Sequence, residues 1–287
     1  MKLRVVGDIV FQDIRHTVPL CIVEDFSREF LFFVKETRDI ARRTIAFASI
    51  YDHPEYSQNS PMSAIDAICM PHDQLPCVLI FVRPEVCTET IALHEVMHAY
   101  LHFAEGFDLP RQFDPALAGD VNFLASLSLN IAMDMHTNER LRQRGFAIDS
   151  LRESYFQGLA EILTRFSRPS YVANVAIQWQ AGAMWGHMLA GAHFYQPTQE
   201  NLRVHRQLDA LCRKRSPGTI RFRDLLVTTF RETGYDTPAK VGRFVDEVTP
   251  KLFAALGEPF RPELLRHTRY GRVNSTETAG RLLMPTS

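Results

Sequence analysis

The pattern of apolar and polar positions divides the chain into a first part with strand signals and a longer part with helical periodicity. Strand-like runs rich in β-branched and aromatic residues occur at 3–11, 44–51 and 77–82. A short helix is predicted at 27–35, and the polar stretch 53–62, which holds two prolines, predicts a loop. The first 86 residues therefore predict a mixed part that contains strands.

Beyond residue 86 the apolar positions recur with the spacing of amphipathic helices. Gly106 and Gly145 stand where a left-handed glycine commonly ends a helix, and residues 107–115 predict a connection with two prolines. We expect an α+β fold in a single domain over 1–270, with a strand-containing part at 1–86, a helical part at 87–270 and a flexible tail at 271–287. Helices are predicted at 88–105, 120–144, 150–166, 171–193, 198–213, 220–233 and 238–256.

Composition and charge narrow the classes of protein. A hydrophobic fraction of 46% and a charged fraction of 23% are ordinary globular values, which exclude a disordered, collagen-like or coiled-coil chain. The net charge of −1 gives no electrostatic reason to expect a nucleic-acid partner. Five cysteines without a C-x-x-C pair are typical of reduced thiols, so we expect a cytoplasmic protein.

One uncharged stretch raises the question of a membrane span. Residues 171–195 contain no acid, Lys or Arg and are long enough to cross a bilayer. The stretch also contains Asn, Gln and His side chains, which are costly in hydrocarbon, together with many small residues. This composition favours a buried, closely packed helix over a membrane-spanning one, so we do not expect a membrane as partner.

The residues with the clearest chemistry are His94-Glu95-Val96-Met97-His98, an H-E-x-x-H pattern. Residues four apart lie one above the other on a helix, so both imidazoles can bind one metal ion. Glu95 is turned by about 100° from His94, so it stands beside the pair. There it can accept a proton from a metal-bound water without being a ligand.

A catalytic zinc normally takes three protein ligands, so a further residue is needed. The extended pattern H-E-x-x-H-x-x-G-x-x-H is excluded because the chain has Leu101 and Ala104 at the positions of its Gly and last His. His102 is a poor choice, because three ligands stacked along one helix cannot surround a tetrahedral ion. We interpret His102 as a surface or supporting histidine.

The predicted helix at 120–144 offers the third ligand. Asn130, Asp134 and Asn138 are spaced by four and form a polar stripe among apolar residues. A carboxylate in such a position needs a cation or hydrogen-bond donors, so Asp134 is the leading candidate. Glu139 and His136 remain competitors, because zinc accepts carboxylate and imidazole alike.

Peptide hydrolysis at a metal site benefits from a side chain that stabilises the oxyanion, and the later helices contain candidates for this role. Tyr155, Tyr171 and His187 are of the right chemical type. Aromatic residues in helices usually belong to the core, so we predict that they pack and assign none of them to catalysis.

The H-E-x-x-H pattern at 94–98 is followed at 130–146 by the pattern N-I-A-x-D-x-x-x-N-x-x-L-x-x-x-G-F. Together these two motifs resemble a group of bacterial zincin-type metallopeptidase domains that are often found ahead of a von Willebrand factor A-like domain. The resemblance covers about 77–146 and places the family's ligand aspartate at Asp134. The spacing from His98 to Asp134 is longer than in that pattern, no Asp-x-Ser-x-Ser motif follows, and the C-terminal helical half is not covered. The matching residues are His94, Glu95, His98, Asn130, Ile131, Ala132, Asp134, Asn138, Leu141, Gly145 and Phe146.

The sequence therefore predicts a zinc-dependent peptidase acting on a peptide or protein substrate. Its Zn²⁺ would be bound by His94, His98 and Asp134, and Glu95 would be the general base. The alternative is a catalytically inactive zinc-binding protein, with a regulatory or assembly role on a peptidase-like scaffold. A helical interaction protein with a chance motif is a third interpretation, and it predicts no bound metal.

Overall fold

The computed structural model describes residues 1–11, 16–54, 56–58, 66–70, 77–106, 119–166, 168, 175–256 and 280–283. The chain forms two compact units. Unit 1 comprises Met1–Phe107 together with Arg272–Ser287, and unit 2 comprises Asp108–Gly271. The α+β class is confirmed, because strands occupy unit 1 and unit 2 is helical in its described residues.

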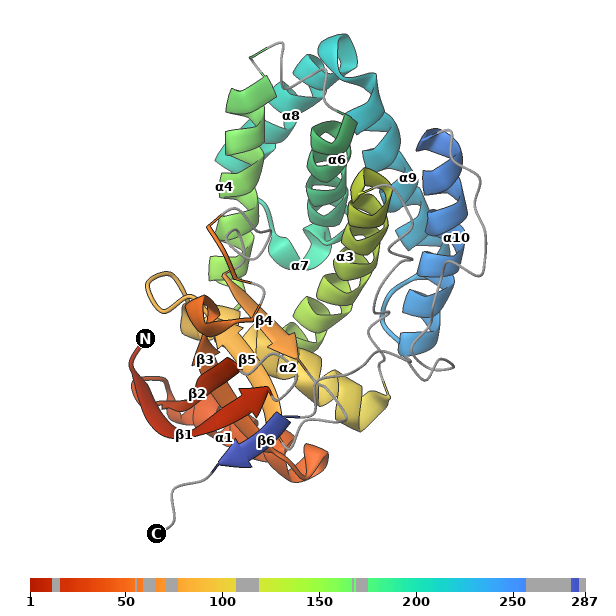
Figure 1. Ribbon diagram of the computed structural model, residues 1–287. Helices are drawn as coiled ribbons and strands as arrows, with labels where there is room; N and C mark the ends of the chain where they lie inside the picture. The colour runs from red at the N-terminus through yellow and green to blue at the C-terminus, as the bar shows by residue number, and fades with distance from the viewer. Residues whose placement is uncertain are drawn as a thin grey trace. The chain divides into compact units, whose positions relative to one another are not determined.

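Unit 1 is built around a mixed sheet of six strands in the order β4-β5-β3-β2-β1-β6 (Figure 1). β3 and β5 are parallel, and the other neighbouring strands are antiparallel. β4 is therefore one edge of the sheet. The strands are β1 (Leu3–Phe11), β2 (His16–Val23), β3 (Thr44–Ser49), β4 (Ala67–Met70), β5 (Cys77–Val82) and β6 (Gly280–Leu283).

Helices α1 (Arg28–Ala41) and α2 (Glu89–Glu105) pack against the sheet and against each other. Phe30 of α1 lies beside Phe47 of β3, with ring centroids 6.1 Å apart, so Phe47 faces the helices. Ala46 and Ala48 point the other way, into an apolar cluster with Leu79 and Phe81. All six residues of β5 are buried, as expected for a strand with both faces covered.

Unit 2 is an assembly of helices in which α6 contacts α3, α4 and α9 (Figure 1). α10 packs against α3 and α9, and α8 packs against α4 and α9. Within the described residues, no helix combines the length and the apolar character needed to cross a membrane. The helices are α3 (Gly119–Gln143), α4 (Asp149–Phe166), α6 (Val175–Ala190), α7 (Ala192–Tyr195), α8 (Gln199–Arg215), α9 (Pro217–Thr233) and α10 (Pro238–Leu256).

The units divide the chain differently from the expected boundary at residue 86. Helix α2 belongs to unit 1, since its apolar face packs on β4 and β5. The expected tail at 271–287 contains β6, which pairs with β1 from Asp8–Leu283 to Phe11–Gly280. The expected connection at 107–115 lies outside the described residues. Of the loop predicted at 53–62, residues 53, 54 and 56–58 are described, and His53 and Pro54 follow a 3-10 turn at Ile50–Asp52.

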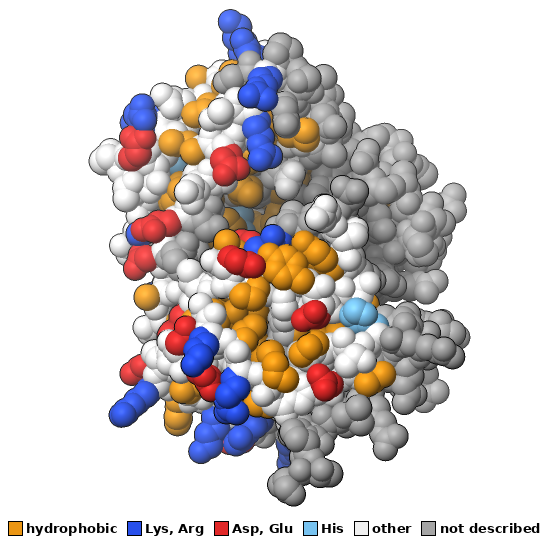
Figure 2. All heavy atoms as spheres, turned by 60° about the vertical axis from the view of Figure 1, so that its left-hand side comes forward, with side chains coloured by type: hydrophobic (Ala, Val, Ile, Leu, Met, Phe, Trp, Pro, Cys, Tyr) orange, Lys and Arg blue, Asp and Glu red, His pale blue; other side chains and the backbone are white. Residues whose placement is uncertain are grey.

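The surface of unit 1 carries several large apolar side chains among charged ones. On the face drawn in Figure 2, basic and acidic side chains both occur between apolar patches. In the described part of the chain, the large exposed apolar side chains are Val5, Leu31, Phe32, Ile40, Tyr51 and Val86.

Candidate metal centre

The helix that carries the H-E-x-x-H pattern has a defined beginning and end. Thr88 is the N-cap, and its hydroxyl accepts a hydrogen bond from the N–H of Ile91 at 3.3 Å. Gly106 ends the helix with φ 64° and donates its N–H to the carbonyl of Leu101. This is the left-handed ending that glycine adopts most readily, and the predicted helix at 88–105 is confirmed.

Contacts from the rest of unit 1 position α2. Both carboxylate oxygens of Glu89, in the first turn, accept hydrogen bonds from Ser27 at the start of α1. The rings of Phe33 and Tyr100 pack between the two helices at 5.6 Å. Several apolar side chains of α2 are fully buried, among them Ala92, Val96, Met97 and Ala99. The helix is thus held at its first turn and along its length.

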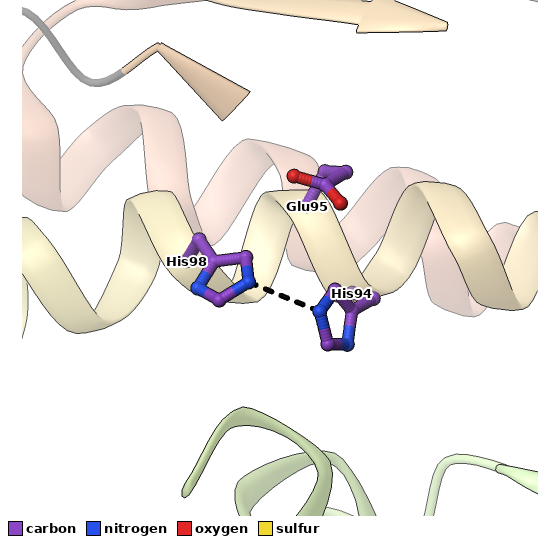
Figure 3. A group of neighbouring side chains, drawn as sticks. All are labelled: His94, Glu95 and His98. Carbon is purple, nitrogen blue, oxygen red and sulfur yellow. Dashed lines mark hydrogen bonds between the residues drawn. The ribbon is translucent and has the colours of Figure 1, made fainter. Parts of the chain in front are cut away.

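His94 and His98 direct their imidazoles toward the same point beside α2 (Figure 3). Their Nε2 atoms lie 3.0 Å apart, and their ring planes are almost perpendicular, at 85°. His94 is 8% exposed and His98 is partly buried. The spacing of four residues thus has the predicted result, because both ring nitrogens converge from adjacent turns.

Glu95 projects from a different side of the helix, as the single-residue step predicts (Figure 3). A carboxylate oxygen of Glu95 and one nitrogen of each imidazole lie within 4.8 Å of one another. The Oε2 atom of Glu95 accepts a hydrogen bond from the backbone N–H of Cys69 on β4, at 2.7 Å. Burial and the nearby Glu95 carboxylate together raise the pKa of the Cys87 thiol to about 12.

The donor set fits a zinc ion. Two nitrogens bound at about 2.0–2.1 Å to one tetrahedral ion are about 3.3–3.4 Å apart, so the Nε2 separation of 3.0 Å needs an adjustment of only a few tenths of an ångström. Within the described residues, His94, Glu95 and His98 form a group of three side chains that can surround a cation. With Glu95 beside the pair, the two imidazoles could supply two ligands to such an ion, and a third ligand would have to come from elsewhere.

Asp134 lies on α3 in unit 2, whose position relative to unit 1 is not determined. Its role as the third ligand therefore stays a prediction. Its side chain is partly exposed, unlike that of Asn138 one turn later, which is fully buried. The Nδ2 of Asn138 donates a hydrogen bond to the hydroxyl of Tyr195 at 2.8 Å, so the amide of Asn138 has a partner within unit 2. Asn130 belongs to α3, and nothing is described of its side chain.

The competing residues on α3 have partners in their own unit. Glu139 accepts hydrogen bonds from both Nε and Nη2 of Arg142, at 3.0 and 2.7 Å, and one from Gln143 at 3.0 Å. His136 is fully buried, and its Nδ1 lies 2.7 Å from the carbonyl oxygen of Tyr235. These contacts make both residues parts of the helical packing of unit 2.

Other candidates from the sequence lie in packed positions. The ring of His102 packs on Phe103, with centroids 4.7 Å apart. His187 is 1% exposed, its Nε2 lies 2.6 Å from the hydroxyl of Tyr195, and the ring of Tyr155 lies against it at 4.6 Å. The prediction that His187 is a packing residue is thus confirmed. Tyr171 lies outside the described residues.

Cys69 is the group near the site that sequence reasoning missed. Its contribution is a backbone N–H, which every residue except proline carries, so no residue type signals it. The four-residue strand β4 that places it is itself too short to give a periodic pattern. Only the fold brings residue 69 to residue 95.

Comparisons of this chain with protein-family models, with curated proteins and with solved structures find no match. The resemblance to zincin-type metallopeptidase domains therefore remains a prediction. What defines the site is its own geometry, two convergent imidazoles and a carboxylate on one helix beside a sheet edge.

Proposed function

We propose that this protein is a zinc-dependent hydrolase that cleaves peptide bonds in a peptide or protein substrate. One observation carries the proposal: the Nε2 atoms of His94 and His98 converge at 3.0 Å while a carboxylate oxygen of Glu95 lies within 4.8 Å. A bound zinc would lower the pKa of a coordinated water to about 7 and polarise a carbonyl group.

The residues of the chain have separate tasks in this proposal. His94 and His98 hold the ion as neutral imidazoles, and Asp134 is proposed as the third ligand. Glu95 accepts the proton of the attacking water and returns it to the leaving amine. Its burial, 8% exposed, limits competing bulk water around the carboxylate. All five cysteines are free thiols, which supports a cytoplasmic location.

Metal analysis tests the proposal first. Purified protein should hold close to one zinc per chain, and His94→Ala or His98→Ala should remove most of it. Incubation with a diverse peptide library, with and without a chelator, then tests turnover by mass spectrometry. If wild-type protein binds none of zinc, cobalt and manganese, the hydrolase proposal is wrong.

A second candidate is a zinc-binding protein without turnover. The hydrogen bond from Cys69 to Glu95 favours it, because a carboxylate that ties a helix to a strand has a structural reason to be present. The peptide library separates the two candidates. One zinc per chain without chelator-sensitive cleavage would support the binding protein.

A further inference from the structure

The hydrogen bonding of β4 determines which of its N–H groups point out of the sheet. The N–H of Arg83 donates to the carbonyl of Asp66 at 2.7 Å, so these opposite residues form a hydrogen-bonded pair. In an antiparallel ladder such pairs alternate with pairs whose N–H groups point away from the partner strand. Ile68 opposite Phe81 is the next hydrogen-bonded pair, and Cys69 opposite Ile80 is a pair of the other kind.

The N–H of Cys69 therefore points away from β5, at the edge of the sheet. Such outward N–H groups on an edge strand normally face water. This one instead donates to Oε2 of Glu95 at 2.7 Å, in a buried position, and Cys69 is itself 7% exposed. Hydrogen bonds from an N–H to a carboxylate are among the stronger ones in proteins.

We propose that the backbone N–H of Cys69 is a positioning group for Glu95. A glutamate side chain has three rotatable bonds, and on a helix surface its carboxylate samples several rotamers. The Cys69 N–H fixes one carboxylate oxygen at the edge of β4 and leaves the other to act on water beside the histidine pair. The edge strand thus contributes to the site through its main chain.

The positioning is tested without any substrate by amide hydrogen exchange, resolved to single residues by NMR. In Glu95→Ala the amide of Cys69 should exchange about 10- to 100-fold faster than in wild type, since it loses its hydrogen-bond acceptor. Glu95→Gln keeps an acceptor oxygen and should retain most of the protection. The amide of Ile68, which bonds within the sheet, is the internal control and should not change. Equal exchange of the Cys69 amide in Glu95→Ala and wild type would overturn the proposal.

The catalytic consequence rests on the proposed hydrolase function and is tested with proline. Cys69→Pro removes the N–H without removing a bond of the β4–β5 ladder. Ala67→Pro is the matched control, because the N–H of Ala67 also points away from β5 and lies two residues from the contact. Cys69→Ala removes the thiol and keeps the N–H, so the comparison with Cys69→Pro isolates the N–H.

We expect Cys69→Pro to lower kcat about 10- to 100-fold relative to Cys69→Ala, with KM and zinc per chain unchanged. Ala67→Pro should keep the wild-type kcat. An equal loss in both proline variants, or no loss in Cys69→Pro, would overturn the catalytic role. If wild-type protein cleaves no peptide, the proposed function fails, and the exchange experiment still decides whether Cys69 holds Glu95.

Discussion

Glu95 is the residue at which binding of the metal and chemistry on water can be separated. It stands beside the two histidines on α2, with one oxygen bonded to Cys69. Glu95→Gln keeps the shape and an acceptor for that N–H but cannot take a proton at neutral pH. We expect zinc content and folding to stay near wild type, while turnover falls by at least about 10²–10⁴.

The measurement needs zinc per chain and the hydrolysis rate on one preparation of Glu95→Gln. Full zinc content with a wild-type rate would show that Glu95 is not the base. Loss of zinc together with activity would assign Glu95 to holding the site together.

A comparison of two acids on α3 tests the identity of the third ligand. If Asp134 is the third ligand, as proposed, Asp134→Ala should weaken zinc affinity far more than Glu139→Ala, which removes a carboxylate that binds Arg142 and Gln143. Affinity is measured by competition with a chromophoric chelator, with circular dichroism as the control for folding. Unchanged affinity in Asp134→Ala with a loss in Glu139→Ala would transfer the assignment to Glu139.

At the scale of elements, helices α6 and α9 approach each other so closely that glycine is required on α6. A Cβ built on Gly182 would lie 2.7 Å from the carbonyl oxygen of Thr219 on α9. This contact confirms the expectation, from the small residues in 171–195, of a closely packed helix. Gly242 in α10 has the opposite surroundings, with nothing within 4 Å of a built Cβ.

The same substitution should therefore have opposite effects at the two glycines. Gly182→Ala should lower the free energy of unfolding by about 1–3 kcal/mol, because the helices must move apart. Gly242→Ala should raise it by about 0.5–1 kcal/mol through helix propensity. Urea denaturation followed by circular dichroism measures both, and a stabilised Gly182→Ala would contradict the close packing.

Periodic elements could be predicted from the sequence, whereas short or interrupted ones could not. The helix α2 was predicted within one residue at its start, since Thr88 and Gly106 are strong end signals. Strand β2 contains Pro19, which argues against a central strand. The structure accommodates Pro19 because β2 pairs with β3 at Cys21 and Phe47, beyond the proline.

In the candidate site, too, one feature could be predicted from the sequence and another could not. The convergence of His94 and His98 follows from helix geometry alone, so the sequence was sufficient to predict it. The contact of Glu95 with Cys69 joins residues 26 positions apart and depends on where α2 packs against β4. A sequence pattern carries no information on such a tertiary contact when the donor is the main chain.

For the whole molecule, buried thiols make stability sensitive to alkaline pH. Burial raises the pKa of the Cys77 thiol to about 11 and that of the Cys212 thiol to about 12. Burial and the nearby Glu95 carboxylate raise the pKa of the Cys87 thiol to about 12 as well. An unfolded thiol titrates near 8.5–9, so the unfolded chain loses these protons first as the pH rises. The free energy of unfolding should be unaffected below about pH 8.5 and fall between about pH 9 and 12.

Urea midpoints at pH 7, 9 and 10.5 measure this loss of stability. Tyrosines and lysines titrate in the same range, so Cys77→Ala is the reference that isolates one thiol. Its stability should decline less steeply than that of wild type above pH 9, whatever its value at pH 7. Parallel curves would show that the Cys77 thiol does not contribute.

The pairing of β1 with β6 has a consequence for the order in which the protein is made. Unit 1 takes its strands from both ends of the chain, and unit 2 lies between them in the sequence. A ribosome therefore releases the whole of unit 2 before it releases the strand that covers β1. Until then residues Asp8–Phe11 at the outer edge of β1 lack their partner strand, and an open edge of this kind is a surface on which nascent chains associate wrongly. The time needed to translate about 170 residues, at about 5–20 residues per second, sets how long this edge stays open.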